Sequence, residues 1–235
     1  MEHFNINGEW RIDNRATLND NDKAKHNCQL SIINYQFPTA YAPNTAYISA
    51  ISHAEQIYID FEEPYKRQTF RNHCEILTSQ GVQKLSVPIE KKSCFDTLNN
   101  RPSMIKDVKI DYAENWQRRH WRSLQAAYNN SPFFLYYQDE LRFFYEKKWC
   151  FLIEFNTKLL SFILNKMHIE NRCQVIGNGC LVDLKQNTRH LSPVTRYQFP
   201  TYQQVFNNQN FIPNLSSFDL LFNCGPESKS YLPNF

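Results

Sequence analysis

Glycine is scarce in this sequence, with 5 residues in a chain of 235. Few positions therefore let the backbone approach a phosphate closely, which weighs against a glycine-loop nucleotide site. The chain also lacks a Walker A motif, a dinucleotide-binding GxGxxG, an HExxH zinc motif and the GxSxG nucleophile elbow. The 7 histidines do not fall at metal-ligand spacing with one another, so neither a metal nor another cofactor is expected.

Long apolar runs are missing as well. No run approaches ~20 apolar residues, so we expect no transmembrane helix. The first residues do not show a basic region followed by an apolar one, which is the pattern of a signal peptide. The 7 cysteines include no CxxC pair, and their odd number does not suit a closed disulfide framework. We therefore expect a cytoplasmic protein with reduced thiols.

The charge balance is nearly even, with a net charge of +3 and basic residues scattered among acidic ones. This surplus is too small to predict nucleic-acid binding from bulk electrostatics. Hydrophobic residues make up 42% and aromatic residues 15%, which indicates a globular chain with a sizeable core. We expect a poorly ordered polar arm over residues 1–28 and a single domain over residues 29–235. No heptad pattern or interface stripe predicts an oligomeric state.

The N-terminal half reads as strand, loop, helix and strand. Residues 30–35 (LSIINY) predict a buried strand, and PTAYAP predicts a rigid loop because each proline fixes its own φ. Asn44 is expected to cap a helix that runs through His53, and residues 57–60 (IYID) predict the next strand. This order is typical of a βαβ unit.

Residues 69–77 and 83–89 alternate as strands do, and the turn at 79–81 predicts a hairpin. Residues 104–110 (MIKDVKI) predict a further strand. Helical spacing follows over 115–130 and over 139–167, the latter as one helix or two, and a short terminal helix should begin at Asn214 or Ser216 and stop at Gly225. The predicted fold class is α/β, with a mixed sheet built from the βαβ unit and the hairpin and packed by C-terminal helices.

The helix over 115–130 carries the first candidate site residues. Trp116, His120, Leu124 and Tyr128 recur at i+4 spacing and share one face. In one interpretation this face is an aromatic core stripe in which His120 is a hydrogen-bonded core residue. In the other, His120 reaches a cleft as an acid or base at neutral pH, with Trp116 as a stacking wall. The spacing leaves both interpretations open.

Two more polar clusters stand out. In YKRQTFRNH (65–73), Lys66 and Arg71 lie beside Asn72 and could hold a phosphate or a carboxylate. They could equally pair with the acidic residues of the preceding IDFEEP, which would contribute little stability. Asp219 lies among apolar residues of the terminal helix, which indicates a paired or capping carboxylate.

Together these segments resemble the WbqC-like protein family. The most specific matches are the spacing from W-x3-H-W to Y-x2-SPFF and the terminal motif, and the resemblance covers about residues 38–232. The first loop departs from the family's M-Q-P-x-Y-x-P, because YQFPTAYAP carries extra residues. The matching pieces, in chain order, are PTAYAPNTAYISAISHAEQIYID, YKRQTFRN, LSVPI, IKDVKIDYAENWQRRHW, AAYNNSPFFLYY and FIPNLSSFDLLFNCGPESKSYL.

The resemblance implies a role in surface-polysaccharide biosynthesis. It suggests a transferase that places an acyl or aminoacyl group on an amino sugar or a nucleotide sugar, a small-molecule substrate. On that interpretation His120 is the general base, Lys66 and Arg71 hold an anionic group, and Trp116 flanks a sugar ring. The recurring polar and aromatic positions of the family fall here on Tyr41, Lys66, Arg71, Asn72, Trp116, His120 and Asp219.

The alternative is a non-catalytic binding or scaffold protein of a cell-envelope pathway, because no recognised catalytic motif is present. The two hypotheses differ in one structural expectation. The transferase requires His120, Lys66 and Arg71 to converge on one pocket, whereas the scaffold does not.

Overall fold

The structure is a computed structural model that describes residues 34–54, 56–97, 100–170, 173–175, 188–190, 199–206 and 210–233. The polar arm expected over residues 1–28 lies outside these ranges, so the predicted domain boundary stays a prediction. Most of the segment from 171 to 198 also lies outside them.

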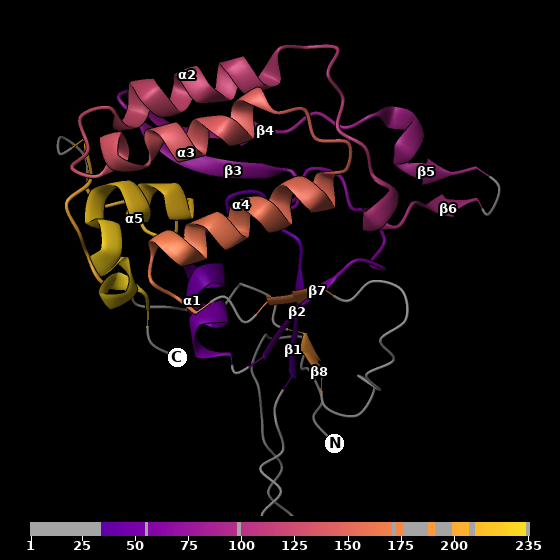
Figure 1. The fold of residues 1–235 in the computed structure, drawn as a ribbon, viewed down its shortest axis with the longest axis horizontal. Coiled ribbons are helices and arrows are strands. Elements are labelled where there is room, and N and C mark those ends of the chain that lie inside the picture. Colours follow the sequence, from indigo (N-terminus) through magenta and orange to yellow (C-terminus); the bar gives the residue numbers. More distant parts are fainter. Residues whose placement is uncertain are drawn as a thin grey trace, which may run out of the picture. The chain divides into compact units, whose positions relative to one another are not determined.

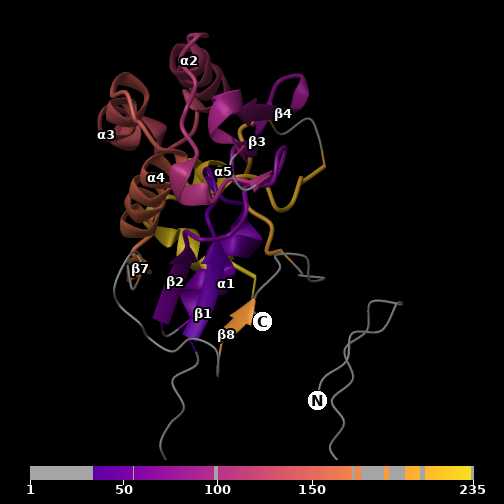
Figure 2. The ribbon, with the colours of Figure 1, turned by 90° about the vertical axis from the view of Figure 1, so that its right-hand side faces the viewer.

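A four-stranded parallel sheet is built around the predicted βαβ unit. The strand order is β7 (Cys173–Val175), β2 (Gln56–Asp60), β1 (Asn34–Pro38) and β8 (Thr188–His190), and Figure 2 shows the four strands in this order. Helix α1 (Thr45–His53) connects β1 to β2, which pair in parallel. The described part of β1 extends to Pro38, three residues beyond the predicted end, and neither β7 nor β8 was predicted.

Helix α1 begins where the sequence predicts. The side chain of Asn44 accepts a hydrogen bond from the backbone N–H of Tyr47 at 3.0 Å, which satisfies one of the free amides of the first turn. Tyr47, Ile48 and Ile51 are at most 2% exposed. The helix is therefore a central element of the core.

The predicted hairpin is confirmed as β3 (His73–Thr78) and β4 (Gly81–Ser86). Gly81 takes a φ of 105° directly after the turn, a conformation that side chains disfavour. The strand does not begin at Thr69, because the N–H of Asn72 bonds back to the carbonyl of Thr69 at 3.1 Å and closes a turn. Arg71 therefore does not share a strand face with His73.

The strand predicted over residues 104–110 is wrong. Its centre is the 3₁₀ helix η2 (Ile105–Asp107), whose N-terminal amides bond to carbonyls of the 61–63 segment. Ile105 and Val108 are both fully buried, and a separation of three residues places them on one side of a 3₁₀ turn. The alternating apolar residues that predicted a strand are therefore buried because they lie in a tight turn. Short elements precede it: η1 (Lys91–Ser93), β5 (Phe95–Asp96) and β6 (Arg101–Pro102).

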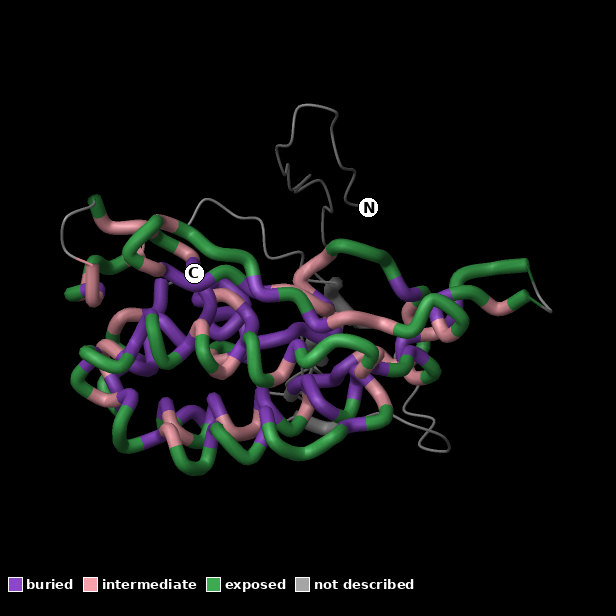
Figure 3. The backbone as a smooth tube through the Cα atoms, turned by 90° about the horizontal axis from the view of Figure 1, so that it is seen from above, coloured by how far each residue is buried: buried purple, intermediate pink, exposed green. Residues whose placement is uncertain are grey.

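The C-terminal part is helical. The helical stretch predicted over 139–167, as one helix or two, is two helices, the first of which begins at Phe134. The terminal helix is capped at Ser216 and ends at Gly225. Figure 1 shows α2 and α3 side by side, and α2 is the one of the two that packs against strand β3 of the hairpin. The inward sides of the helices are the buried ones in Figure 3. The elements are α2 (Trp116–Tyr128), α3 (Phe134–Glu146), α4 (Leu152–Lys166), α5 (Ser217–Cys224) and the 3₁₀ helix η3 (Gly225–Tyr231).

The α/β prediction is confirmed: a parallel strand pair and a hairpin are packed by the C-terminal helices. Within the described ranges, no helix has both the length and the apolar character needed to cross a membrane.

Candidate functional site

His120 lies inside a closed aromatic network. Its side chain is 2% exposed, and its Nδ1 lies 2.9 Å from the hydroxyl of Tyr41. That hydroxyl also bonds to the hydroxyl of Tyr145 at 2.9 Å, and the backbone of Ser86 makes a further hydrogen bond with His120. Burial, followed by the charge of nearby Arg119, lowers the pKa of His120 to about 4. The imidazole is therefore neutral and bonded to protein groups at neutral pH.

Trp116 belongs to the same closed network. It is fully buried, and its ring packs edge-on against His120 with centroids 5.1 Å apart and against Phe155 at 5.7 Å. Both of its faces are near protein, so it does not form an open wall for a sugar ring. Its role as a stacking residue stays a prediction, and so does the role of His120 as a base.

The second predicted cluster does not join this network. The guanidinium of Arg71 forms a two-point ion pair with Glu63, with Nε 2.8 Å from Oε1, and Arg71 is 7% exposed. Its charge is thus balanced inside the protein. The side-chain amide of Asn72 donates to the carbonyl of Val87 at 3.1 Å, while Lys66 is exposed at the surface.

Asp219 is fully buried in the first turn of α5. Its Oδ2 accepts hydrogen bonds from the hydroxyl of Tyr202 at 2.6 Å and from the amide of Gln204 at 2.9 Å. Gln204 in turn exchanges hydrogen bonds with the backbone of Ile212. Burial raises the pKa of Asp219, and the hydrogen bonds from Tyr202, Gln204 and Tyr128 oppose that rise. This carboxylate ties the 199–206 segment to α5.

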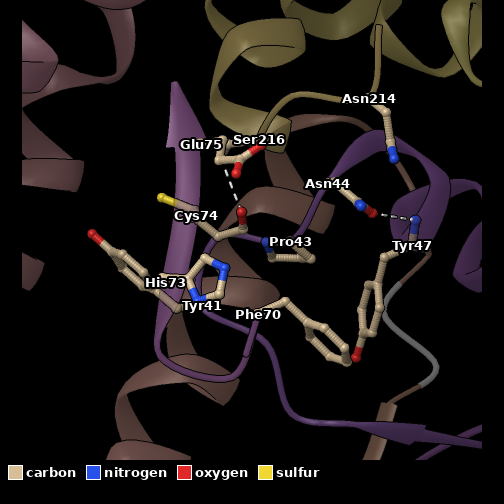
Figure 4. Close-up of a pocket in the computed structure, with 11 residues that line it drawn as sticks. Tyr41, Pro43, Asn44, Tyr47, Phe70, His73, Cys74, Glu75, Asn214 and Ser216 are labelled. Atoms are coloured by element: carbon tan, nitrogen blue, oxygen red, sulfur yellow. Dashed lines mark hydrogen bonds between the residues drawn. The ribbon is translucent and has the colours of Figure 1, made fainter. Parts of the chain in front are cut away.

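A small cavity of about 150 Å³ lies where three distant segments meet. They are the proline-flanked loop before α1, the start of β3 with the turn preceding it, and the chain leading into α5, as Figure 4 shows. We call this cavity the polar pocket. Its lining residues are Tyr41, Ala42, Pro43, Asn44, Tyr47, Phe70, His73, Cys74, Glu75, Asn214 and Ser216.

Ser216 fastens the three segments together. Its N–H donates to the carbonyl of Glu75 at 2.9 Å, and its hydroxyl donates to the carbonyl of Ala42 at 2.9 Å. The N–H of the next residue, Ser217, donates to the carbonyl of Pro43 at 2.7 Å. Because these bonds fix backbone groups of all three segments, the pocket wall is held independently of any ligand.

Two residues of the pocket wall adopt left-handed backbone conformations. Ala42 has a φ of 39° and Asn214 a φ of 59°. Such a φ costs a residue with a β-carbon roughly 1–2 kcal/mol, less for Asn, and persists only where the surroundings enforce it. Here the Ser216 hydroxyl holds the carbonyl of Ala42, and the Asn214 side chain accepts from the N–H of Ala46 at 3.1 Å. Strain of this kind is typical of functional loops.

The titratable groups of the pocket come from β3. His73 and Glu75 are two residues apart on the strand and therefore point to the same face. Burial and the charge of Lys84 lower the pKa of His73, so its imidazole is neutral at neutral pH and can accept a proton. The Nδ1 of His73 is buried and has no hydrogen-bond partner among the described residues. Burial raises the pKa of the neighbouring Cys74 thiol, which disfavours a thiolate nucleophile.

Asn44 and Asn214 supply the polar side chains of the opposite wall. Each uses its Oδ1 to accept a backbone N–H near the start of α1. Their Nδ2 groups have no hydrogen-bond partner within the described ranges and remain available as donors. The described lining includes Glu75 but neither a lysine nor an arginine, and Lys84 lies opposite Glu75 on the neighbouring strand. The lining itself therefore carries one formal charge, that of Glu75, and Lys84 on β4 adds a positive charge nearby.

Of the seven residues predicted for the site, Tyr41 alone lines the polar pocket. The structure brings Tyr41, Trp116 and His120 together in the closed network, but it leaves Lys66 and Arg71 apart from them. Three other polar residues of the pocket, His73, Glu75 and Asn214, were not among the predicted site residues. Both clusters singled out in the sequence reach this cavity, since YKRQTFRNH ends at His73 and the terminal motif contributes Asn214 and Ser216 near its start. In the described parts of the chain, no group of three or more His, Cys, Asp or Glu could hold a metal ion.

The comparisons with known proteins agree with the sequence resemblance. The sequence model of the WbqC-like protein family matches residues 39–191 and 183–231. The chain is also similar to an uncharacterised protein of Mycobacterium tuberculosis (strain ATCC 25618 / H37Rv), Rv1507c. The two are 26% identical over 225 residues, which span 82% of this chain and 94% of that protein. No solved structure gave a significant match.

Proposed function

This chain belongs to the WbqC-like protein family, and we propose that it transfers an acyl or aminoacyl group to the amine of an amino sugar, free or nucleotide-linked, in surface-polysaccharide biosynthesis. In this proposal the polar pocket receives the amine-bearing part of the acceptor. The observation that carries it is the pairing of a neutral imidazole, His73, with a carboxylate, Glu75, in a cavity whose described lining has no cation.

The charge of the pocket supports an amine. An ammonium group is attracted by the negative charge of Glu75, the one charged residue of the described lining. The amide donors of Asn44 and Asn214 suit the hydroxyl oxygens of a sugar. At about 150 Å³ the cavity is smaller than the roughly 300–1,000 Å³ typical of sites that enclose a whole drug-sized ligand. It therefore suits one end of the acceptor, with the remainder outside.

The proposed step needs one proton acceptor. The acceptor amine forms a bond to the carbonyl carbon of an activated acyl or aminoacyl donor. The bond from that carbon to the donor's leaving group breaks, and the leaving group keeps the electron pair. His73 takes the proton that the amine loses, which its neutral imidazole allows at neutral pH. Glu75, on the same strand face, attracts the ammonium form of the acceptor, which releases a first proton to solvent to become the reactive amine. The second proton, lost as the amide bond forms, is the one that His73 takes.

His120 has a positioning role in this proposal. It bonds to the hydroxyl of Tyr41, and the next two residues of the chain, Ala42 and Pro43, line the pocket. Removing the imidazole would loosen that loop without touching the acceptor. The exposed Lys66 remains a candidate for contact with an anionic group of the donor, as the sequence predicted.

Thermal-shift measurements with glucosamine and glucose test the acceptor class, because the two sugars differ at the amine. We expect glucosamine to raise the melting temperature of the full chain and glucose to have a smaller effect, since a ligand that binds only the folded state stabilises it. His73→Gln and Glu75→Gln should abolish the difference. Glu154→Gln, which removes an exposed carboxylate from α4, should retain it.

Equal shifts with both sugars, or none with either, would contradict the amine site. Where binding is found, mass spectrometry of glucosamine incubated with the protein and a panel of acyl thioesters or aminoacyl donors tests the transfer itself. The product should gain the mass of the acyl group in the wild type and not in His73→Gln.

A binding or scaffold role is the alternative, and one surface favours it. On α3, Leu135 is 57% exposed, Tyr136 77% and Phe143 54%, which is unusual for large apolar side chains. If this surface binds a protein, Tyr136→Ser together with Phe143→Ser should release the partner captured by the wild type. A wild type that captures no partner, and that transfers an acyl group, would rule this alternative out.

A further inference from the structure

A second cavity of about 640 Å³ lies between the outer face of α2 and the turn of the β3–β4 hairpin. Three arginines on two consecutive turns of α2 line it, namely Arg118, Arg119 and Arg122. The side chain of Gln83 on β4 donates to the hydroxyl of Ser123 on α2 at 3.4 Å, a contact that ties one wall to the other. We call this cavity the arginine groove.

Positive charge is concentrated in the arginine groove, although the chain as a whole has a nearly even charge balance. Arg119 pairs with Glu114 at 2.9 Å, but Arg118 and Arg122 have no ion pair with any described residue. They are one helical turn apart, so their side chains extend from the same face. The described lining includes no carboxylate, and its remaining polar residues are neutral side chains such as Gln80 and Gln83. Two uncompensated guanidinium groups thus face one cavity.

We propose that the arginine groove binds the diphosphate group of a phosphate-bearing small molecule. Guanidinium groups match phosphate oxygens in two-point hydrogen bonds, and two of them one turn apart can engage two adjacent phosphates. The volume is within the range of small-molecule sites. A single-stranded nucleic acid is disfavoured, because such ligands stack their bases on aromatic side chains and the described lining has none.

This inference is independent of the transfer reaction. The arginine groove and the polar pocket share no lining residue, and their charges are opposite in character. The closing experiment therefore uses a probe without an amine or a sugar, so its failure is distinguishable from failure of the proposed function.

Isothermal titration calorimetry of the full chain with inorganic pyrophosphate at low ionic strength tests the groove. We expect saturable binding to the wild type that weakens as salt is added. Arg118→Gln with Arg122→Gln should weaken it at least about tenfold, the effect of losing a charged hydrogen bond. Both side chains are exposed, so the variant should fold, which circular dichroism checks. The matched control is Arg142→Gln, an exposed arginine on α3 that pairs with Glu146, and it should bind as the wild type does.

Three results would overturn the inference. They are no heat of binding in the wild type, equal loss in the Arg142→Gln control, and unchanged affinity in the double variant. In a parallel arm, a single-stranded RNA oligonucleotide that binds the groove and is not displaced by pyrophosphate would assign it to nucleic acid and contradict the proposal.

Discussion

Two histidines in this protein have lowered pKa values but different surroundings. His120 is 2% exposed and bonded to Tyr41 and to the Ser86 backbone, whereas His73, which has a backbone hydrogen bond with Thr69, lines a cavity two residues from Glu75. Burial is the main cause of the lowered pKa in both. The difference shows that a perturbed pKa identifies a candidate group, and that access to a ligand decides whether the group can react.

The same contrast separates two carboxylates. Asp219 is buried and accepts hydrogen bonds from Tyr202 and Gln204, while Glu75 is exposed and lines the polar pocket. The sequence singled out His120 and Asp219, the enclosed member of each pair. If the contrast is correct, changing an enclosed group should cost stability, and changing a pocket group should cost ligand binding.

The largest effect on stability should come from His120→Ala. The substitution leaves a void among Trp116, Tyr41 and Tyr145 and removes a partner of the Tyr41 hydroxyl. We expect the free energy of unfolding to fall by about 2–4 kcal/mol in urea denaturation. His73→Ala, at a partly exposed position, should cost less than about 1 kcal/mol. If His73→Ala lowered the free energy of unfolding more than His120→Ala does, the contrast between the two histidines would be contradicted.

The pH dependence of the free energy of unfolding should reveal the contribution of His120. Its pKa is about 4 in the folded protein and near its ordinary value of 6.5 when unfolded. The unfolded chain therefore binds the proton more tightly, so this contribution is complete above pH 6.5 and is lost as the pH falls towards 4. The loss should be about 3 kcal/mol. The groups around the ring do not titrate in this window, since Tyr41 and Tyr145 have raised pKa values and an arginine stays charged.

His120→Gln provides the control for this profile. Carboxylates elsewhere titrate in both proteins, so the difference between the wild type and the variant reports His120. Parallel profiles from pH 7.5 to pH 4 would mean that the imidazole is accessible to protons in the folded state, contrary to its enclosure.

A smaller effect is expected at Asp219. Asp219→Ala leaves the hydroxyl of Tyr202 and the amide of Gln204 without their acceptor, which should cost about 1–3 kcal/mol. Asp219→Asn keeps one oxygen acceptor and removes the negative charge of a carboxyl group whose pKa is raised by burial. It should therefore destabilise the protein less than Asp219→Ala does. Chemical denaturation of both variants measures this order. A larger loss in Asp219→Asn would show that the negative charge itself is required.

Much of the fold could be predicted because its signals are local. Asn44 caps α1 through a residue three positions away, and the turn at Gly81 lies between two strands that it joins. The α2 spacing also placed His120 and Trp116 correctly on an inward face. It could not tell whether that face meets a core or a cavity, because periodicity reports only which side of a helix is inward.

The polar pocket could not be predicted in the same way. Ser216 bonds to Ala42 and Glu75, which are more than a hundred positions away in the sequence. The strand predicted over 104–110 failed for a related reason, because this segment forms a 3₁₀ turn and isolated bridges with three separate segments and no continuous ladder with one strand. Contacts of such long range depend on topology that no local pattern records.

The most direct test of the contrast is an NMR titration of the histidine side chains with glucosamine. The imidazole signals of His73 and His120 are assigned from their loss in His73→Gln and His120→Gln. The account predicts that the His73 signal shifts saturably with glucosamine and not with glucose, while the His120 signal barely moves. A saturable shift of His120 with no change at His73 would contradict it and return the site to the aromatic network of α2.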